Sequence, residues 1–405
     1  MVLVRSIFLA VLLLAASPTG PANAGEWDFS GNVSLETRVF PYNPAFADQD
    51  RTTVSPSVAL QPELVFETES GNDRLTVQPF FRYDADDPHR THGDIRIANW
   101  LHQAETWDLV VGLDKVFWGV AESRHLVDIV NQTDLVERAD GEEKLGQPMI
   151  NLNVQSEFGT WSAFILPGFR ERTFPGRRAR LRGPLRVTTD NPVYQSDLGD
   201  KHVDGALRWS HSLSGFDVGA SHFYGTSREP RLVATVLGNG EAVLVPHYDL
   251  IHQTGLDLQY TKEALLVKLE AISRSGHGKR FYAAIGGVEY TLFQIFESKS
   301  DLGLLAEYQY DGRNAATAPG TINDSDIFIG ARWALNDEKD TALLVGAIMD
   351  VRSGTRLFSI EAERRLTDTM KLELEGRFSF NVSAGDAASA FRDDDQVTLR
   401  LKYFF

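Results

Sequence analysis

Residues 396–405 read QVTLRLKYFF, with apolar or aromatic side chains at every second position and mostly polar or basic side chains between them. Successive side chains of a β-strand point to opposite faces, so this segment predicts a strand with one apolar and one polar face. The apolar face holds Val397, Leu399, Leu401, Tyr403 and Phe405, and the polar face holds Gln396, Thr398, Arg400 and Lys402.

The same alternation recurs along the chain, for example over 27–36, 75–83 and 370–380. Such segments place hydrocarbon on one side and solvated polar groups on the other, as a wall between lipid and a wet lumen requires. We therefore expect an all-β chain that forms a single transmembrane antiparallel β-barrel. About 18 strands are expected, near 27–40, 53–68, 73–84, 93–104, 107–119, 148–157, 160–169, 202–213, 216–226, 250–261, 264–274, 279–293, 301–312, 325–335, 341–352, 355–366, 369–381 and 394–405.

The connections between these segments alternate between short and long. Transmembrane barrels have short periplasmic turns and longer extracellular loops, and an even strand count leaves both ends of the chain in the periplasm. An error of one strand would destroy this alternation. The short set includes 71–72, 105–106, 159, 213–215, 262–263, 336–340 and 367–368, and the long set includes 120–147, 170–201, 227–249 and 313–324.

Residues 1–24 have the features of a cleaved secretory signal peptide. Arg5 precedes the apolar run Ile7–Ala16, and Ala22-Asn23-Ala24 forms a small-x-small cleavage site. The apolar run is shorter than the ~20 residues that a membrane-spanning helix needs, although an uncleaved anchor is the alternative. We expect residues 25–405 to form the barrel, with a net charge of −17 instead of −16, because Arg5 is the one charged residue removed.

Composition alone does not separate a barrel from a soluble periplasmic protein. The charged fraction of 24% and the mean hydropathy of −0.22 are typical of soluble chains. In a membrane barrel, however, lipid-facing and lumen-facing residues alternate, so hydropathy averages out. The absence of cysteine excludes disulfides and thiolate metal sites. Aromatic girdles are expected from Trp100, Trp107, Trp118, Trp161, Trp209 and Trp333, for which packing in a soluble β-sandwich is the alternative.

An arginine-rich segment, RERTFPGRRARLRGPLR at 170–186, reverses the acidic balance of the chain. It has Glu171 as its single acid. Guanidinium groups bind carboxylate and phosphate in a bidentate manner and stay charged, so a loop of them at a channel mouth would concentrate anions. The alternatives are contacts with lipopolysaccharide phosphates or with acidic neighbouring loops. The candidate anion-selecting residues are Arg170, Arg172, Arg177, Arg178, Arg180, Arg182 and Arg186.

A second long connection, 120–147, is a candidate constriction of the channel. Leu126, Val130 and Leu135 could form one helical stripe, and the loop would then fold into the lumen instead of lying on the surface. Charges of both signs are expected on the lumen wall, where they would act as a selectivity ladder or as ion pairs that stiffen the wall. The candidate lumen-facing basic residues are Arg38, Arg82, Arg96, Arg208, Arg332 and Arg377.

Two segments carry a resemblance to known proteins. The segment with Leu399, Leu401, Tyr403 and Phe405 resembles the closing strand of bacterial outer-membrane proteins, which implies recognition by the barrel assembly machinery. The stretch FRERTFPG at 169–176, together with 120–147, resembles Gram-negative porin-like proteins that include alginate-export and DUF1302-type barrels. The likeness covers most of the chain as strand pattern and these short stretches as sequence. It implies an eighteen-stranded channel for an anionic or organic solute.

The motifs of common enzymes are missing from the sequence, which has no GxSxG, HExxH, P-loop or EF-hand pattern and no metal-ligand spacing among its ten histidines. We expect a porin-like channel of the outer membrane, with no cofactor and no metal. The alternatives are a non-conducting structural or adhesive barrel and a lipid-modifying enzyme with a Ser–His or Asp–His pair at its rim. The expected partners are outer-membrane lipid and lipopolysaccharide, the assembly machinery and a small-molecule solute, but not nucleic acid. The solute and the oligomeric state stay open.

Overall fold

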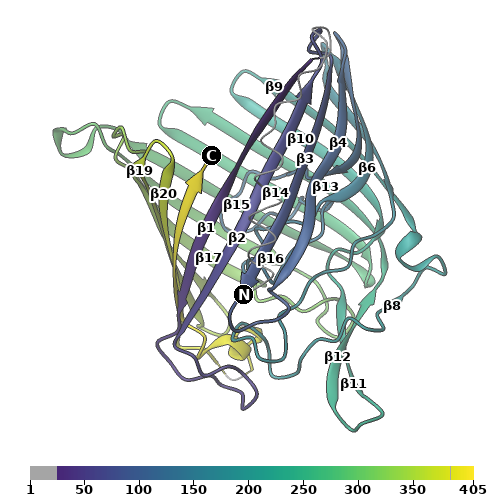
Figure 1. Ribbon diagram of the computed structural model, residues 1–405, viewed down its shortest axis with the longest axis vertical. Helices are drawn as coiled ribbons and strands as arrows, with labels where there is room; N and C mark the ends of the chain where they lie inside the picture. The colour runs from purple at the N-terminus through teal and green to yellow at the C-terminus, as the bar shows by residue number, and fades with distance from the viewer. Residues whose placement is uncertain (1–24, 384) are drawn as a thin grey trace.

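The computed structural model describes residues 25–383 and 385–405, which form a closed antiparallel β-barrel (Figure 1). Strand β1 (Glu26–Val39) pairs with β2 (Val54–Glu67) on one side and with β21 (Gln396–Phe404) on the other. Each intervening strand pairs with its two neighbours, so the 18-stranded sheet has no free edge. The expected barrel of about 18 strands is confirmed. The proposed signal peptide, 1–24, lies outside the described residues.

The barrel strands follow the expected segments closely. The other strands of the wall are β3 (Asp73–Asp84), β4 (His92–Gln103), β5 (Trp107–Asp114), β6 (Gln147–Ser156), β7 (Gly159–Pro167), β9 (Val203–Leu213), β10 (Phe216–Thr226), β13 (Leu250–Lys262), β14 (Leu265–Gly276), β15 (Gly278–Leu292), β16 (Asp301–Asp311), β17 (Ser325–Ala334), β18 (Ala342–Asp350), β19 (Arg356–Thr367) and β20 (Met370–Phe380). In the part of the chain that the structure describes, no helix is both long enough and apolar enough to cross a membrane.

Short turns gather at one end of the barrel and long loops at the other, as the connection lengths predict (Figure 1). We call these the turn end and the loop end. At the loop end, a small sheet of β8 (Val193–Tyr194), β11 (Arg231–Val236) and β12 (Ala242–Tyr248) lies outside the wall. Short 3-10 segments complete the secondary structure at η1 (Gly199–Lys201), η2 (Ile295–Glu297) and η3 (Ala387–Phe391).

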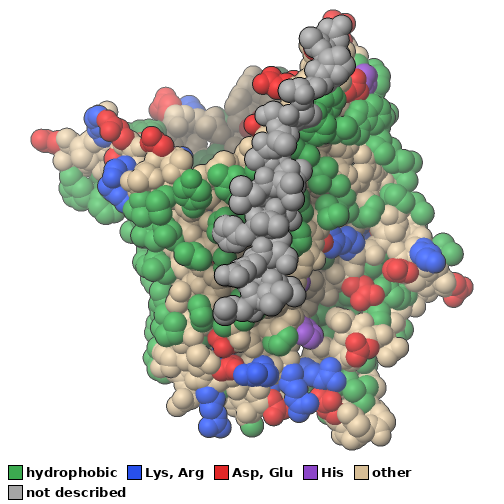
Figure 2. All heavy atoms as spheres, viewed as in Figure 1, with side chains coloured by type: hydrophobic (Ala, Val, Ile, Leu, Met, Phe, Trp, Pro, Cys, Tyr) green, Lys and Arg blue, Asp and Glu red, His purple; other side chains and the backbone are tan. Residues whose placement is uncertain are grey.

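Hydrophobic side chains cover the outside of the strands, and charged side chains gather toward the two ends of the barrel (Figure 2). This distribution follows from the alternation, because every second residue of a strand faces outward. Tryptophans lie on the outer surface near the turn end, where Trp27, Trp100, Trp107, Trp161 and Trp333 are all exposed. Trp209 also belongs to this region. Of the six tryptophans expected in girdles, all but Trp118 therefore lie near strand ends.

Trp118 departs from that expectation because β5 ends at Asp114 instead of at 119. Beyond Asp114 the chain leaves the wall and enters the lumen, where the Trp118 side chain is buried. The side chain of Asn131 holds the bend. Its Oδ1 accepts a hydrogen bond from the Val116 amide at 2.9 Å, and its Nδ2 donates to the carbonyls of Asp114 and Leu145, both at 2.9 Å. Asn131 thereby ties together the two ends of the segment 115–146.

Candidate functional site in the barrel lumen

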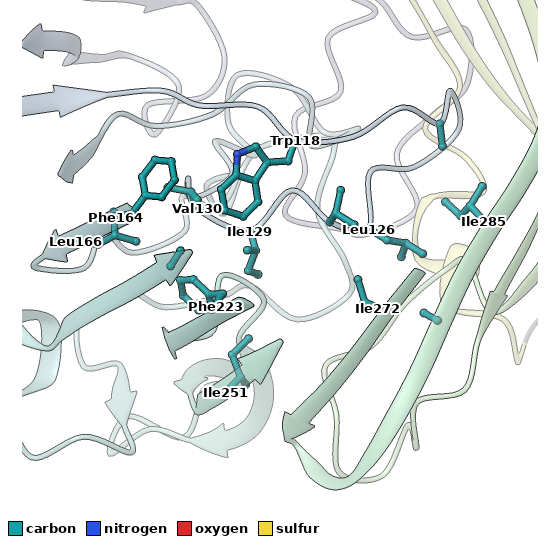
Figure 3. Close-up of a cluster of buried hydrophobic side chains, with 14 of the residues drawn as sticks. Trp118, Leu126, Ile129, Val130, Phe164, Leu166, Phe223, Ile251, Ile272 and Ile285 are labelled. Atoms are coloured by element: carbon teal, nitrogen blue, oxygen red, sulfur yellow. The ribbon is translucent and has the colours of Figure 1, made fainter. Parts of the chain in front are cut away.

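The segment 115–146, here called the lumen loop, packs its apolar side chains against one side of the wall (Figure 3). Trp118, Leu126, Val127, Ile129 and Val130 are buried in a cluster with lumen-facing residues. The predicted placement in the lumen is correct, but the predicted helical stripe of Leu126, Val130 and Leu135 is wrong, because these residues lie in bends and turns and not in a helix. The wall contributes Met149, Phe164, Leu166, Ala206, Phe223, Ile251, Ile272, Ala283 and Ile285 from strands β6, β7, β9, β10, β13, β14 and β15.

The lumen loop has no helix in which its backbone amides could bond one another. Four of these amides bond instead to the carboxylate of Glu270, on strand β14 of the wall. Its two oxygens accept the backbone amides of Val120 at 2.7 Å, Ala121 at 2.9 Å, Leu126 at 2.7 Å and Val127 at 3.2 Å. Buried amides need acceptors, and an ionised acceptor forms the stronger bond. Glu270 therefore clamps the loop to the wall. Its role could not be predicted from the sequence, because alternation shows only that Glu270 faces the lumen.

Glu307 on β16 makes a second clamp of the same kind. Its carboxylate accepts the backbone amides of Glu122 at 2.7 Å and Ser123 at 2.8 Å. Gln309, two residues further along the same strand, donates its Nε2 to the Ser123 hydroxyl at 2.8 Å. Two neighbouring regions of the wall thus hold successive residues of the loop.

The six lumen-facing arginines that the sequence suggested are all paired with acids. Three of the acids, Glu137, Asp134 and Glu122, belong to the lumen loop, so these arginines also attach the loop to the wall. The shortest contacts are Arg38–Glu36 at 3.1 Å, Arg82–Glu137 at 2.8 Å, Arg96–Asp134 at 2.7 Å, Arg208–Asp257 at 2.7 Å, Arg332–Glu122 at 2.6 Å and Arg377–Glu361 at 2.6 Å.

The arginine-rich loop, 170–186, lies at the loop end, and its side chains have different surroundings. Arg177 and Arg178 are exposed and pair with acids of a neighbouring loop, Asp48 and Asp50. Arg182 donates to backbone carbonyls of its own loop instead of to an acid. The remaining ion pairs join this loop to other parts of the chain, with Arg170–Asp94 at 2.7 Å, Arg180–Asp394 at 3.1 Å and Arg186–Glu241 at 2.7 Å.

Arg172 belongs to a cluster of four arginines around the carboxylate of Glu229. Glu229 Oε2 lies 2.7 Å from Arg274 Nη1 and 3.1 Å from Arg313 Nη1. Burial alone would raise the pKa of Glu229, but Arg313, Arg274, Arg124 and Arg172 together hold the pKa well below its usual value. The carboxylate therefore stays ionised.

The cluster has more positive than negative charge. Asp311 is its second acid, at 2.7 Å from Arg313 and 3.1 Å from Arg124. Arg172 makes no ion pair within 4.0 Å among the described residues, and its Nε donates to Gln132 of the lumen loop at 3.3 Å. Four guanidinium groups thus face two carboxylates, and Arg172 has spare donors.

A cavity of about 450 Å³ adjoins this cluster. Arg172, Glu229 and Arg231 supply its charged lining. The rest of the lining is apolar and consists of Phe174, Pro230, Leu232, Val233, Ala315, Ala316, Ala318, Pro319 and Gly320. A cavity of this size is within the range of sites for small molecules. In the described ranges, no group of three or more His, Cys, Asp or Glu side chains is arranged to hold a metal.

Comparison with known proteins gives similarity only at the level of structure. No family model and no curated protein matches the chain, so the resemblance to alginate-export and DUF1302-type barrels stays a prediction. A loop-deletion mutant of OmpT, an outer membrane protein of Vibrio cholerae, is 11% identical with a TM-score of 0.48, over 95% of this chain and all of that one. A mutant of the Rh. blastica porin is 12% identical with a TM-score of 0.43, over 94% of this chain and all of that one.

Proposed function

We propose that this chain is an outer-membrane channel that passes small solutes carrying negative charge. The observation that supports the solute class is the cavity lined by Arg172, which adjoins a cluster in which four guanidinium groups face two carboxylates. The expected orientation places the loop end outside the cell and the turn end in the periplasm. A solute entering from outside would then meet these guanidinium groups near the loop end of the lumen.

The positive charge of the cluster is less fully paired than that of the wall, which favours selection of anionic solutes at the cavity. The arginines of the wall are each paired with a carboxylate, so their fields are largely cancelled. Exposed charges at a wet mouth are screened over ~8 Å at physiological salt, which limits the reach of Arg177 and Arg178. Arg172 lies in a recess next to Phe174, where a carboxylate of the solute would lose water and gain bidentate contacts.

The proposed location rests on the apolar outer surface, the tryptophans near the turn end and the expected signal peptide. Lipid contacts the apolar band of such a barrel, and the assembly machinery is the expected partner of the strand that ends near Phe405. In this interpretation the lumen loop narrows the channel on the side of β6–β15.

Reversal potentials in a planar bilayer under a salt gradient test the proposed selection. The wild-type channel should prefer anions at low ionic strength, and Arg172→Gln should reduce that preference. Arg178→Gln is the matched control, because Arg178 is in the same loop but is exposed and paired with Asp50. Equal reversal potentials for wild type and Arg172→Gln would contradict the assignment of selection to the cavity.

A further inference from the structure

The outer face of the barrel has a polar interruption toward the loop end, on the adjacent strands β10, β13, β14 and β15. Outward-facing residues there are polar where most neighbouring outward positions are apolar. We call this group the outer polar patch. It consists of His222, His252, Thr254, Ser273, Ser275 and Arg280.

The patch begins at a depth where a bilayer of ordinary thickness would still present hydrocarbon. On β14 the outward apolar residues run from Leu265 to Ala271. At about 3.3 Å per residue and a strand tilt of about 40°, that run covers roughly 15 Å of membrane thickness. The apolar band of an outer-membrane barrel is about 25 Å tall. On β1 the outward face from Trp27 to Val39 covers roughly 30 Å by the same arithmetic, with Thr37 as its polar member.

Hydrogen bonds within the patch orient its donors toward the outside without using all of them. Arg280 Nη1 donates to Ser273 Oγ at 2.9 Å, and Nη2 donates to Ser275 Oγ at 3.3 Å. A guanidinium group has five N–H donors, so three remain. Within the described ranges Arg280 makes no ion pair, and none of the outward-facing positions of these four strands is acidic.

Two histidines extend the patch across the neighbouring strands. The rings of His222 and His252 lie with their centroids 5.8 Å apart, and His222 Nδ1 lies 3.0 Å from Thr254 Oγ1. Tyr224 stacks on His252 at 4.6 Å, as is common for aromatic rings at a membrane interface. The patch therefore combines one fixed positive charge with several polar side chains on a surface that faces lipid.

We propose that the outer polar patch binds a phosphate group of a phosphorylated glycolipid in the outer leaflet, with Arg280 as the principal ligand. The proposal rests on the outer-membrane location proposed above. Phosphate oxygens would accept hydrogen bonds from the free guanidinium donors. The lipid headgroup would also cover polar side chains that acyl chains at this depth would leave without hydrogen-bond partners. A second copy of this chain placed here by a two-fold axis would bring Arg280 against another positive patch, which disfavours a two-fold dimer through this surface.

The test measures lipid retained by the full chain extracted from the outer membrane in a mild detergent. Native mass spectrometry would compare wild type, Arg280→Gln and Lys262→Gln after addition of deep-rough lipopolysaccharide or of its dephosphorylated form. Lys262 is the control because it is on the outward face of β13 at the turn end. We expect wild type and Lys262→Gln to retain the phosphorylated lipid. Loss of one charge-assisted contact should weaken retention by about tenfold, both in Arg280→Gln and for the dephosphorylated lipid.

Equal retention by wild type and Arg280→Gln, or retention that does not depend on phosphate, would overturn the proposal. A lipid-free oligomer of wild type that Arg280→Gln converts to monomers would also overturn it, because a second copy would then cover the patch. Absence of the protein from the outer-membrane fraction would instead contradict the location under "Proposed function", so the two failures are distinguishable. Heat-dependent gel mobility confirms that each variant is folded.

Discussion

Replacing Glu270 by Gln should release the lumen loop from the wall. The carboxylate accepts two amides on each oxygen, Val120 and Ala121 on Oε1 and Leu126 and Val127 on Oε2. The amide of Gln keeps one acceptor oxygen and places an NH₂ group where the other oxygen was. Two backbone donors would then face a donor.

The expected loss follows from the number of broken bonds. Glu270 is fully buried, so the two released amides have no ready access to water. Each hydrogen bond to a charged group contributes about 1.5–3 kcal/mol, so the variant should loosen the loop by about 3–6 kcal/mol. The barrel wall should persist, because the antiparallel pairing of β14 does not use this side chain.

Single-channel conductance and limited proteolysis would measure the release. Glu270→Gln should raise the conductance and expose cleavage sites in the lumen loop. Glu363→Gln is the control, since Glu363 faces the lumen on β19 and pairs with Lys371 at 2.7 Å without contacting the loop. Wild-type conductance together with wild-type protease resistance in Glu270→Gln would refute the role of the carboxylate as a clamp.

Two further predictions concern assembly and pH. Phe405→Ala should reduce the amount of heat-modifiable barrel in membranes several-fold more than Phe404→Ala does. The reason is that the ring centroid of Phe405 lies 5.6 Å from that of Phe29 and its backbone pairs with Gly31 at 3.1 Å. Equal levels of the two variants would contradict this prediction. Burial, assisted by Arg274, lowers the pKa of His277 to about 4, so the folded state favours the neutral ring. The contribution of His277 to the free energy of unfolding is fully present above the unfolded pKa of about 6.5. As the pH falls from there to about 4, this contribution is lost, which lowers the free energy of unfolding by up to about 3 kcal/mol. His277→Gln should flatten that part of the pH profile of thermal unfolding measured by gel mobility, and an unchanged profile would count against the assignment.

The strands could be predicted from the sequence because the physical requirement on them is local. Every second residue must face lipid, and the period of two is visible in segments such as 370–380. The segment after Asp114 was the exception. Val116 and Trp118 have the even-numbered spacing of the lumen-facing positions of β5, but the chain leaves the wall after Asp114, where the side chain of Asn131 holds the bend.

The contacts within the lumen could not be predicted, because they join residues that are far apart in the chain. Glu270 and Val120 are 150 positions apart, and no local pattern links them. Composition did identify the arginine-rich loop. It could not show that Arg178 is exposed and paired, whereas Arg172 faces the cavity, because that difference depends on acids contributed by other loops.

Recording from the purified wild-type barrel in a planar bilayer tests the proposed channel most directly. The proposal predicts discrete conductance steps and a preference for anions that declines as the salt concentration rises, because screening shortens the reach of the guanidinium groups. A folded, heat-modifiable barrel that inserts into the bilayer and conducts no ions would contradict the channel function and would favour a structural role.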